Sequence, residues 1–183
     1  MALKSSVFKF KLNVSDLERG VYEDFALSLA RHPSETDARM MLRLVAFARH
    51  AHELLSFGRG ISTDDEPDLW QKDLTGHIEL WIDLGTPDPE RIRKACNRAN
   101  EVALYGYGER SLAVWWRKHQ DTLERFKNLS VFAISDEHYD ALGGFAKTGT
   151  DLQCTLSGNE LWLNSADHSL AINFGTLRAA EQA

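Results

Sequence analysis

The sequence has few of the residues that mark disulfide-rich, zinc-finger or low-complexity proteins. Its 183 residues include two cysteines, four prolines and twelve glycines. Cys96 and Cys154 are far apart in the chain and do not have the short spacing of paired metal ligands. With so little cysteine, we expect a reduced protein without disulfides, which fits a cytoplasmic location.

Long apolar runs are missing as well. The segment MALKSSVFKFKLNV at the start holds no apolar run long enough for a signal peptide or a membrane span. No internal repeat, linker or low-complexity segment stands out in the remaining sequence. Because 43% of the residues are hydrophobic and 26% are charged, we expect one globular domain over residues 1–183, with a real core and no membrane partner.

An excess of positive charge is absent too. The formal net charge is -6 and the sequence pI is about 5.6. These values argue against a wholly basic nucleic-acid binder. A local basic patch on an acidic protein is still compatible with a nucleic-acid partner. The composition does not fix the oligomeric state.

The sequence does contain strands of alternating polarity and amphipathic helices. Strands are expected at 7–14, 24–31, 67–74, 77–85, 101–108, 129–135, 151–164 (a hairpin) and 169–174. The segment 24–31 also fits a helix in part. Helices are expected at 32–57 (the longest, with Ser34 as N-cap), after Asp88, and at 109–126. This order predicts an α/β (α+β) fold in which helices flank a mixed β-sheet.

The segment DDEPDLWQKDLTGHIELWIDLG carries carboxylates through what reads as buried sheet. In the strand 77–85, alternate residues form an aliphatic face, and Glu79, Trp81 and Asp83 form the other face. If the chain reverses at Thr75-Gly76, opposite residues are expected to be Leu74 with His77, Lys72 with Glu79, Trp70 with Trp81, and Asp68 with Asp83.

Asp68 and Asp83 would then place like charges directly opposite each other, which is destabilising. One hypothesis is that both carboxylates bind a single divalent cation. The alternative is that the hairpin ends before Asp68 and both acids are solvated. Glu79 is expected to pair with Lys72 rather than to bind metal.

Basic residues recur at helical spacing in two places. Arg91, Lys94 and Arg98 follow Asp88 at helical spacing. One possibility is that they form a solvated face, and the other is that Lys94 points back toward the acids. Arg39 and Arg43, with Arg31 and His32 ahead of them, are either solvated or able to hold phosphates. The tryptophans of VWW, at 114–116, are expected to be core rather than a base-stacking platform.

Three segments carry a family resemblance. LARHPSETDARMMLRL, DDEPDLW and WIDLGTPDPERIRKA resemble the YaeQ family of small bacterial proteins, and the likeness extends over nearly the whole chain. The resemblance implies a permuted variant of the PD-(D/E)XK nuclease fold. It also implies descent from magnesium-dependent phosphodiesterases.

The resemblance also implies roles for residues. Pro67-Asp68 matches the PD element and Asp83 the D/E element, so both aspartates would bind Mg²⁺ (or Mn²⁺). The motif lysine would fall at position 85, which is Gly85, and Lys94 is the nearest candidate for a migrated lysine. Glu35 resembles the helical acid that completes such a site.

Two functions follow as expectations. The first is a Mg²⁺-dependent phosphodiesterase or nuclease, in which Lys94 and Glu35 act beside the metal and His32, Arg39 and Arg43 contact substrate. The second is a catalytically silent nuclease-like fold that binds nucleic acid or protein in a regulatory role. Asp68, Asp83, Glu35 and Lys94 favour the first, whereas Gly85 and the acidic net charge favour the second.

Overall fold

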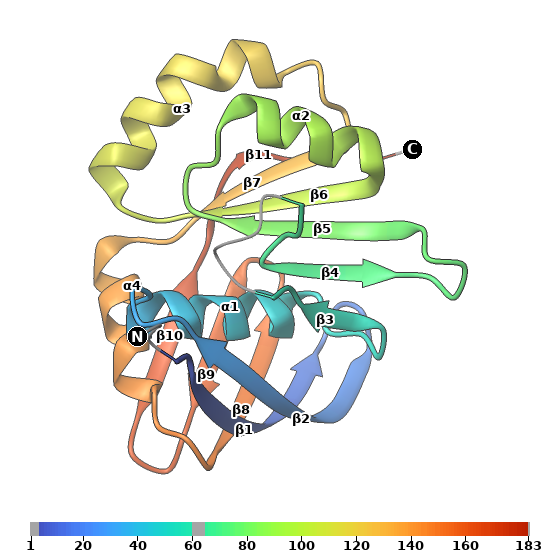
Figure 1. The fold of residues 1–183 in the computed structure, drawn as a ribbon. Coiled ribbons are helices and arrows are strands. Elements are labelled where there is room, and N and C mark those ends of the chain that lie inside the picture. The colour runs from blue at the N-terminus through green and yellow to red at the C-terminus, as the bar shows by residue number, and fades with distance from the viewer. Residues whose placement is uncertain (1–3, 60–64, 183) are drawn as a thin grey trace. The chain divides into compact units, whose positions relative to one another are not determined.

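The strands form two separate mixed sheets in the computed structural model, which describes residues 4–59 and 65–182 (Figure 1). Four α-helices accompany them in these residues. The chain divides into unit 1, Met1–Ala51 with Glu137–Phe174, and unit 2, His52–Asp136 with Gly175–Ala183. The expected mixed α+β fold is confirmed, but the expectation of a single sheet was wrong, because the strands form two sheets. The expectation of one domain stays a prediction.

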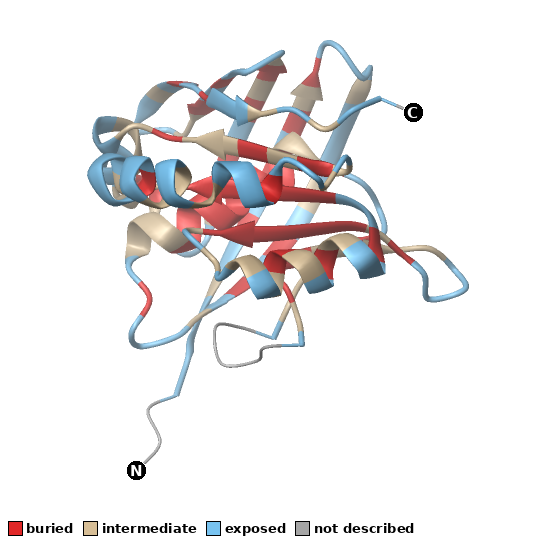
Figure 2. Ribbon diagram, turned by 90° about the horizontal axis from the view of Figure 1, so that it is seen from above, coloured by how far each residue is buried: buried red, intermediate tan, exposed pale blue. Residues whose placement is uncertain are grey.

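The sheet of unit 1 has five strands in the order β10-β9-β8-β1-β2. They are β1 (Ser6–Asp16), β2 (Val21–Arg31), β8 (Thr150–Ser157), β9 (Glu160–Asn164) and β10 (Ser169–Asn173). β1 pairs in parallel with β8, and the other pairs are antiparallel. Burial alternates along β1, which confirms the predicted half-buried strand. Figure 2 shows that buried residues gather along the strands, whereas the loops are mostly exposed.

Unit 1 also contains α1 (Asp37–Arg49) and all but the first residue of α4 (Asp136–Leu142), which is followed by a 3₁₀ turn at Gly143–Phe145. Neither α4 nor the turn was predicted. The predicted N-cap, Ser34, was wrong: the Thr36 hydroxyl accepts from the Arg39 N–H at 3.1 Å, whereas the Ser34 hydroxyl contacts His32 Nδ1. α1 also ends earlier than expected, because Leu55–Phe57 forms β3 instead.

The sheet of unit 2 has six strands in the order β11-β7-β6-β5-β4-β3. They are β3 (Leu55–Phe57), β4 (Leu69–Lys72), β5 (Ile78–Leu84), β6 (Ala99–Gly106), β7 (Leu129–Ala133) and β11 (Gly175–Arg178), the last unpredicted. β5, β6 and β7 are parallel, and α2 (Pro89–Arg98) and α3 (Glu109–Leu123) make the crossovers between them. At 15 residues, α3 is longer than α1, which has 13.

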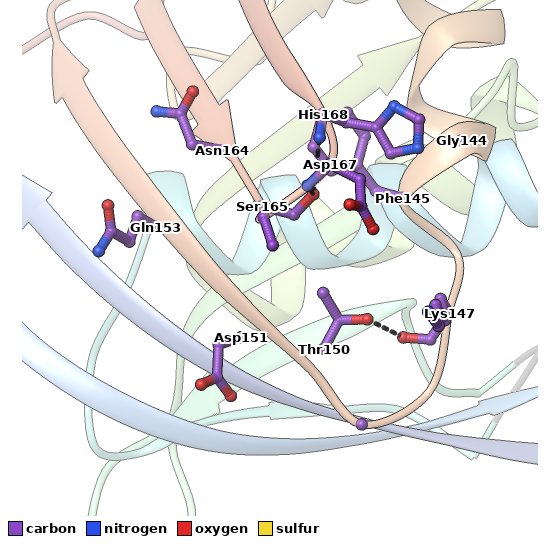
Figure 3. A pocket seen from close by; sticks show the side chains of 12 residues that line it. Gly144, Phe145, Lys147, Thr150, Asp151, Gln153, Asn164, Ser165, Asp167 and His168 are labelled. Carbon is purple, nitrogen blue, oxygen red and sulfur yellow. Dashed lines mark hydrogen bonds between the residues drawn. The ribbon is translucent and has the colours of Figure 1, made fainter.

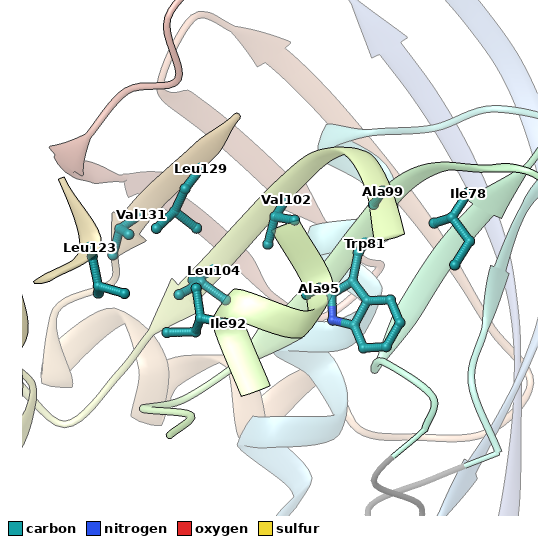
Figure 4. Close-up of a cluster of buried hydrophobic side chains, with 10 residues drawn as sticks. All are labelled: Ile78, Trp81, Ile92, Ala95, Ala99, Val102, Leu104, Leu123, Leu129 and Val131. Carbon is teal, nitrogen blue, oxygen red and sulfur yellow. The ribbon is translucent and has the colours of Figure 1, made fainter. Parts of the chain in front are cut away.

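The core of unit 2 lies between its sheet and the two crossover helices (Figure 4). Side chains from α2 and the end of α3 pack on those of β5, β6 and β7, and the cluster comprises Ile78, Trp81, Ile92, Ala95, Ala99, Val102, Leu104, Leu123, Leu129 and Val131. β5 is buried on both faces, since Ile82 and Trp81 are each almost wholly covered. The sheet therefore holds Asp83 in a low-dielectric setting.

The hairpin of β4 and β5 follows the predicted register only in part. Trp70 faces Trp81 as predicted, but Lys72 faces Ile78, so the predicted pairs Lys72 with Glu79 and Leu74 with His77 were wrong. The turn explains the shift. The Asp73 carboxylate accepts from the backbone N–H of Thr75 and His77 at 2.8 and 2.9 Å, and Gly76 has φ +90. A loop with a left-handed glycine adds a residue and displaces the register.

Two features bear on the other expectations. No helix within the described residues is long and apolar enough to span a bilayer. Both cysteines are free thiols, as expected for a reduced protein. Burial raises the pKa of Cys96 and of Cys154 to about 12, so both remain protonated at neutral pH.

His50, which follows α1, is kept neutral by its surroundings. Burial lowers its pKa to about 3, with Arg49 and Arg19 acting in the same direction. The folded state therefore binds no proton at His50 while the unfolded state, with a pKa of 6.5, does so in mild acid. Because the unfolded state then holds more protons, the free energy of unfolding falls as the pH drops from 6.5 towards about 3.

We expect His50→Gln to remove this contribution. Through this one group, the free energy of unfolding cannot change by more than about 1.4 kcal/mol per pH unit. Urea unfolding at about pH 7.5 and about pH 4.5 should show a smaller loss of stability in His50→Gln than in the unmodified protein. The exposed His168 offers a matched control in His168→Gln. Parallel pH profiles for the unmodified protein and His50→Gln would rule out a proton-linked penalty at His50.

Candidate functional site

Asp68 and Asp83 are neighbours across the β4–β5 pair. Leu69 faces Ile82, so Asp68, just before β4, falls opposite Asp83 near the end of β5. The Asp68 N–H donates to Asp83 Oδ1 at 3.3 Å, and the Leu84 N–H donates to Asp68 Oδ2 at 2.8 Å. Each carboxylate therefore bonds to the backbone of the opposite strand, and these bonds fasten the two strands together.

Arg91 offsets the charge of Asp83. The guanidinium donates from Nε to Oδ2 at 2.9 Å and from Nη2 to Oδ1 at 3.1 Å. Trp81 Nε1 adds a third side-chain donor, to Oδ2 at 2.9 Å. Asp83 is only 3% exposed, so the alternative of a solvated acid was wrong for this residue. A two-pronged guanidinium–carboxylate pair is among the stronger polar contacts in proteins.

The start of α2 places Arg91 over the end of β5. The Asp88 side chain caps the helix by accepting from the Glu90 N–H at 2.8 Å, and Pro89 occupies the first turn. Ile92 and Ala95 are buried, which fixes the rotation of the helix. Arg91 Nη2 also donates to the Glu66 carbonyl at 2.9 Å, so the guanidinium is held from two directions.

The neighbouring cations of α2 have other contacts. Arg93 forms a fork with Glu90, and this hydrogen bond holds the pKa of the Glu90 carboxyl below its usual range. The Arg98 guanidinium lies 5.2 Å from the Trp81 ring centroid. Lys94 is exposed. The side chain that reaches Asp83 from this helix is thus Arg91, and the catalytic role of Lys94 stays a prediction.

Gly85 stands where the PD-(D/E)XK resemblance would place a lysine. Its φ is +91, a left-handed conformation that side chains rarely adopt. A Cβ here would lie 3.6 Å from Tyr107 Cε1, and the Gly85 N–H donates to the Tyr105 carbonyl at 2.8 Å. The backbone is therefore shaped for glycine, and a lysine at this position would be strained.

Glu79 does not pair with Lys72. Its carboxylate accepts from Asn100 Nδ2 at 2.8 Å, and Lys72 Nζ lies 3.6 Å from the Trp70 ring centroid. The register shift at Lys72 accounts for the error, because it removes the lysine from the position opposite Glu79.

The remaining predicted residues belong to unit 1, and three of them, Glu35, Arg39 and Arg43, pair with one another. Glu35 is 6% exposed and accepts from Arg43 Nη2 at 2.6 Å, Arg43 Nε at 3.0 Å and Arg39 Nη1 at 2.7 Å. Arg43 Nη2 also donates to the Ala30 carbonyl at 3.0 Å. His32 Nδ1 accepts from the Ser34 N–H at 3.1 Å. Glu35, the acid expected to complete the site, and the two expected phosphate contacts therefore form one ion-pair cluster.

The aspartates as arranged do not fit a divalent cation. A carboxylate offers about four acceptor positions, and Asp83 receives four N–H donors, from Trp81, from Asp68 and two from Arg91. Across the described residues, no group of three or more His, Cys, Asp or Glu side chains is placed to hold a metal. What the prediction missed is Arg91. The signal was an arginine, suited to a carboxylate fork, in the first turns after β5.

Unit 1 also has a hollow of about 550 Å³ on its sheet (Figure 3). Gln153 and Asn164, from paired strands, lie at one side of it, and His168 at the other. Ser165 Oγ accepts from the backbone N–H groups of Asp167 and His168 at 3.3 and 3.1 Å. The Ser165 hydroxyl therefore stabilises its own loop, and none of the predicted site residues lines this hollow.

Comparison with known proteins gives one consistent family. Residues 1–174 match the family model described as YaeQ protein. "Uncharacterized protein YaeQ" of Salmonella typhi is 46% identical, over 94% of this chain and 95% of that protein. Its counterpart in Escherichia coli (strain K12) is 44% identical, over 94% and 96%.

Two solved structures are also similar. The crystal structure of YaeQ protein from Xanthomonas axonopodis pv. citri has a TM-score of 0.93 and 42% identity, and the match covers 96% of this chain and 99% of that one. The YaeQ protein from Pseudomonas syringae has a TM-score of 0.87 and 35% identity, over 96% and 97%. The names of these relatives state no activity.

We expect Arg91→Met to destabilise unit 2 because it leaves the Asp83 charge buried without a cation. Breaking a buried pair costs about 3–5 kcal/mol. The Arg91 side chain is 26% exposed, so we expect a smaller loss, about 2 kcal/mol. Urea unfolding would measure it.

Lys94→Met is the matched control, since it removes one exposed cation from the same helix. Its effect should lie within about 0.5 kcal/mol of zero. The double variant Asp83→Asn/Arg91→Met should lose less stability than the two single variants added together. Equal losses in Arg91→Met and Lys94→Met would show that the fork contributes nothing.

Proposed function

Since this chain belongs to the YaeQ family, we propose that it binds nucleic acid without cleaving it. The observation that carries this proposal is the occupation of the Asp83 carboxylate by Arg91. Hydrolysis of a phosphodiester by a nuclease-type site needs carboxylate oxygens open to a metal ion. Here those oxygens accept N–H donors from the protein itself.

The absence of a lysine at position 85 also supports binding without cleavage. The left-handed backbone at Gly85 disfavours any side chain at that position. Glu35, the acid expected to complete the site, is neutralised by Arg39 and Arg43. Each part of the expected catalytic apparatus, with the exception of Lys94, is thus either engaged in a structural contact or absent.

The charge distribution supports a polyanionic ligand. Residues 89–127, which contain α2 and α3, carry nine Lys and Arg against five Asp and Glu, a local charge of +4 on a chain whose net charge is -6. Several of these cations are exposed, namely Lys94, Arg98, Arg110, Arg117, Lys118 and Arg125. Since α2 and α3 cover one face of the sheet of unit 2, their outer side offers contacts to phosphates (Figure 1).

A second candidate is the phosphodiesterase implied by the resemblance to the PD-(D/E)XK superfamily. The proximity of Asp68 and Asp83 favours it. It requires Arg91 to leave Asp83, so that the two aspartates would face Mg²⁺ or Mn²⁺ with Lys94 nearby. The fixed position of Arg91, which also binds the Glu66 carbonyl, weighs against it.

Binding and cleavage are measured together on one protein preparation. Labelled single- and double-stranded DNA and RNA would be followed by fluorescence anisotropy over a range of salt, and by gel with Mg²⁺ or Mn²⁺. We expect binding that weakens with salt and no cleavage. We also expect no rise in melting temperature with Mg²⁺, because Asp83 already accepts four N–H donors from the protein.

Two variants separate the candidates. Metal-dependent cleavage that is absent in Asp83→Asn and strongly reduced in Lys94→Met would establish the phosphodiesterase instead. Cleavage that persists in Asp83→Asn would indicate a contaminating nuclease. A protein that binds none of the four nucleic acids would refute the proposed function itself.

A further inference from the structure

A groove runs along the outer side of α3 in unit 2. The groove is shallow and open, with a volume of about 590 Å³, and eight residues line it: Gly108, Arg110, Ser111, Val114, Trp115, Lys118, His119 and Asp136. The helical members are three adjacent pairs, at 110–111, 114–115 and 118–119, which repeat every four residues and so form one stripe of α3. Val114 is 58% exposed, which leaves an apolar surface open in the middle of the groove.

Trp115 provides a fixed aromatic wall. Its indole Nε1 donates to the Pro87 carbonyl at 3.2 Å, so the ring is held in one orientation. The ring also contacts Trp116 and His119, with centroids 6.3 and 5.8 Å away. Trp115 packs partly on the core yet lines the groove, so the expectation that it is simply core was incomplete. A rigid, half-buried indole offers a stacking surface at little cost in entropy.

Cations stand at both ends of the apolar stripe. Arg110 and Lys118 are eight residues apart on α3, which separates them by roughly 12 Å along the helix axis. Both are exposed. The single acidic residue among those lining the groove, Asp136, accepts from the Glu109 N–H at 2.9 Å at the start of α3. The groove thus presents an aromatic face between two positive charges.

We propose that this groove holds single-stranded nucleic acid, with a base stacked on Trp115 and backbone phosphates at Arg110 and Lys118. This inference rests on the proposed function and locates its ligand. A base can stack on an indole only when it is free of its pairing partner, so a single strand is favoured over a duplex. DNA and RNA share this chemistry.

The first test separates phosphate contacts from stacking. With a labelled single-stranded oligonucleotide, Arg110→Gln/Lys118→Gln should lower the slope of log affinity against log salt by about 1.4. The exposed lysines of unit 1 supply a charge-matched control, Lys9→Gln/Lys11→Gln, which should leave that slope unchanged. Trp115→Phe should weaken binding roughly fivefold or more and reduce the quenching of tryptophan fluorescence by the bound strand.

The second test uses neighbouring positions of one helix. Val114→Asp places a negative charge inside the groove, whereas Ala113→Asp places the same charge at an exposed residue outside its lining. Neither change touches a buried side chain, so both variants should fold. We expect Val114→Asp to weaken single-strand binding about tenfold and Ala113→Asp to weaken it much less.

The outcomes distinguish the two proposals. Salt-dependent binding that is indifferent to Arg110, Trp115 and Val114 would overturn the groove while leaving nucleic-acid binding in place. Equal affinity for duplex and single strand would likewise overturn base stacking. Absence of binding to any nucleic acid would remove both proposals. Groove-dependent binding of a poly-glutamate peptide, with none of an oligonucleotide, would assign the groove to an acidic protein partner.

Discussion

The two hydrogen bonds between Arg91 and Asp83 fix the position of α2 relative to β4 and β5 in unit 2. Asp83 belongs to β5 and Arg91 to α2, while the Asp68 N–H at the start of β4 bonds to the same carboxylate. Two strands and a helix therefore converge on one buried charge. Because such a charge is tolerated only with its partners in place, packing of α2 and pairing of β4 with β5 are coupled.

Unit 1 uses the same solution with different residues. Glu35 is buried before α1, and Arg43 reaches back from the helix to it and to the Ala30 carbonyl of β2. Both units thus join a strand or loop to the helix that follows it through an arginine bonded to a buried carboxylate. Guanidinium groups suit this task because they bond two acceptors at once in a fixed plane.

Much of the fold was predictable, because alternation along β1 and β5 and the Asp88-Pro89 start of α2 are local signals. The errors arose where contacts between residues far apart in the sequence determine the secondary structure or the strand register. Leu55 fits the apolar period of α1, yet it pairs with β4, and the Asp73 turn moved Lys72 by one residue. At the site, the proximity of Asp68 and Asp83 followed from register. The choice of Arg91 over Lys94 depends on helix rotation, which spacing alone does not determine.

The parallel pairing of β1 with β8 has a consequence for biosynthesis. Phe10 pairs with Thr150, so β1 cannot pair with β8 until most of the chain has left the ribosome. The β1–β2 hairpin can form early, since its strands are close in sequence. Until β8 has been synthesised, however, the other edge of β1 has unpaired N–H and C=O groups that can pair with a strand of another chain. The nascent chain therefore passes through a stage prone to aggregation, and chaperone demand should be greatest then.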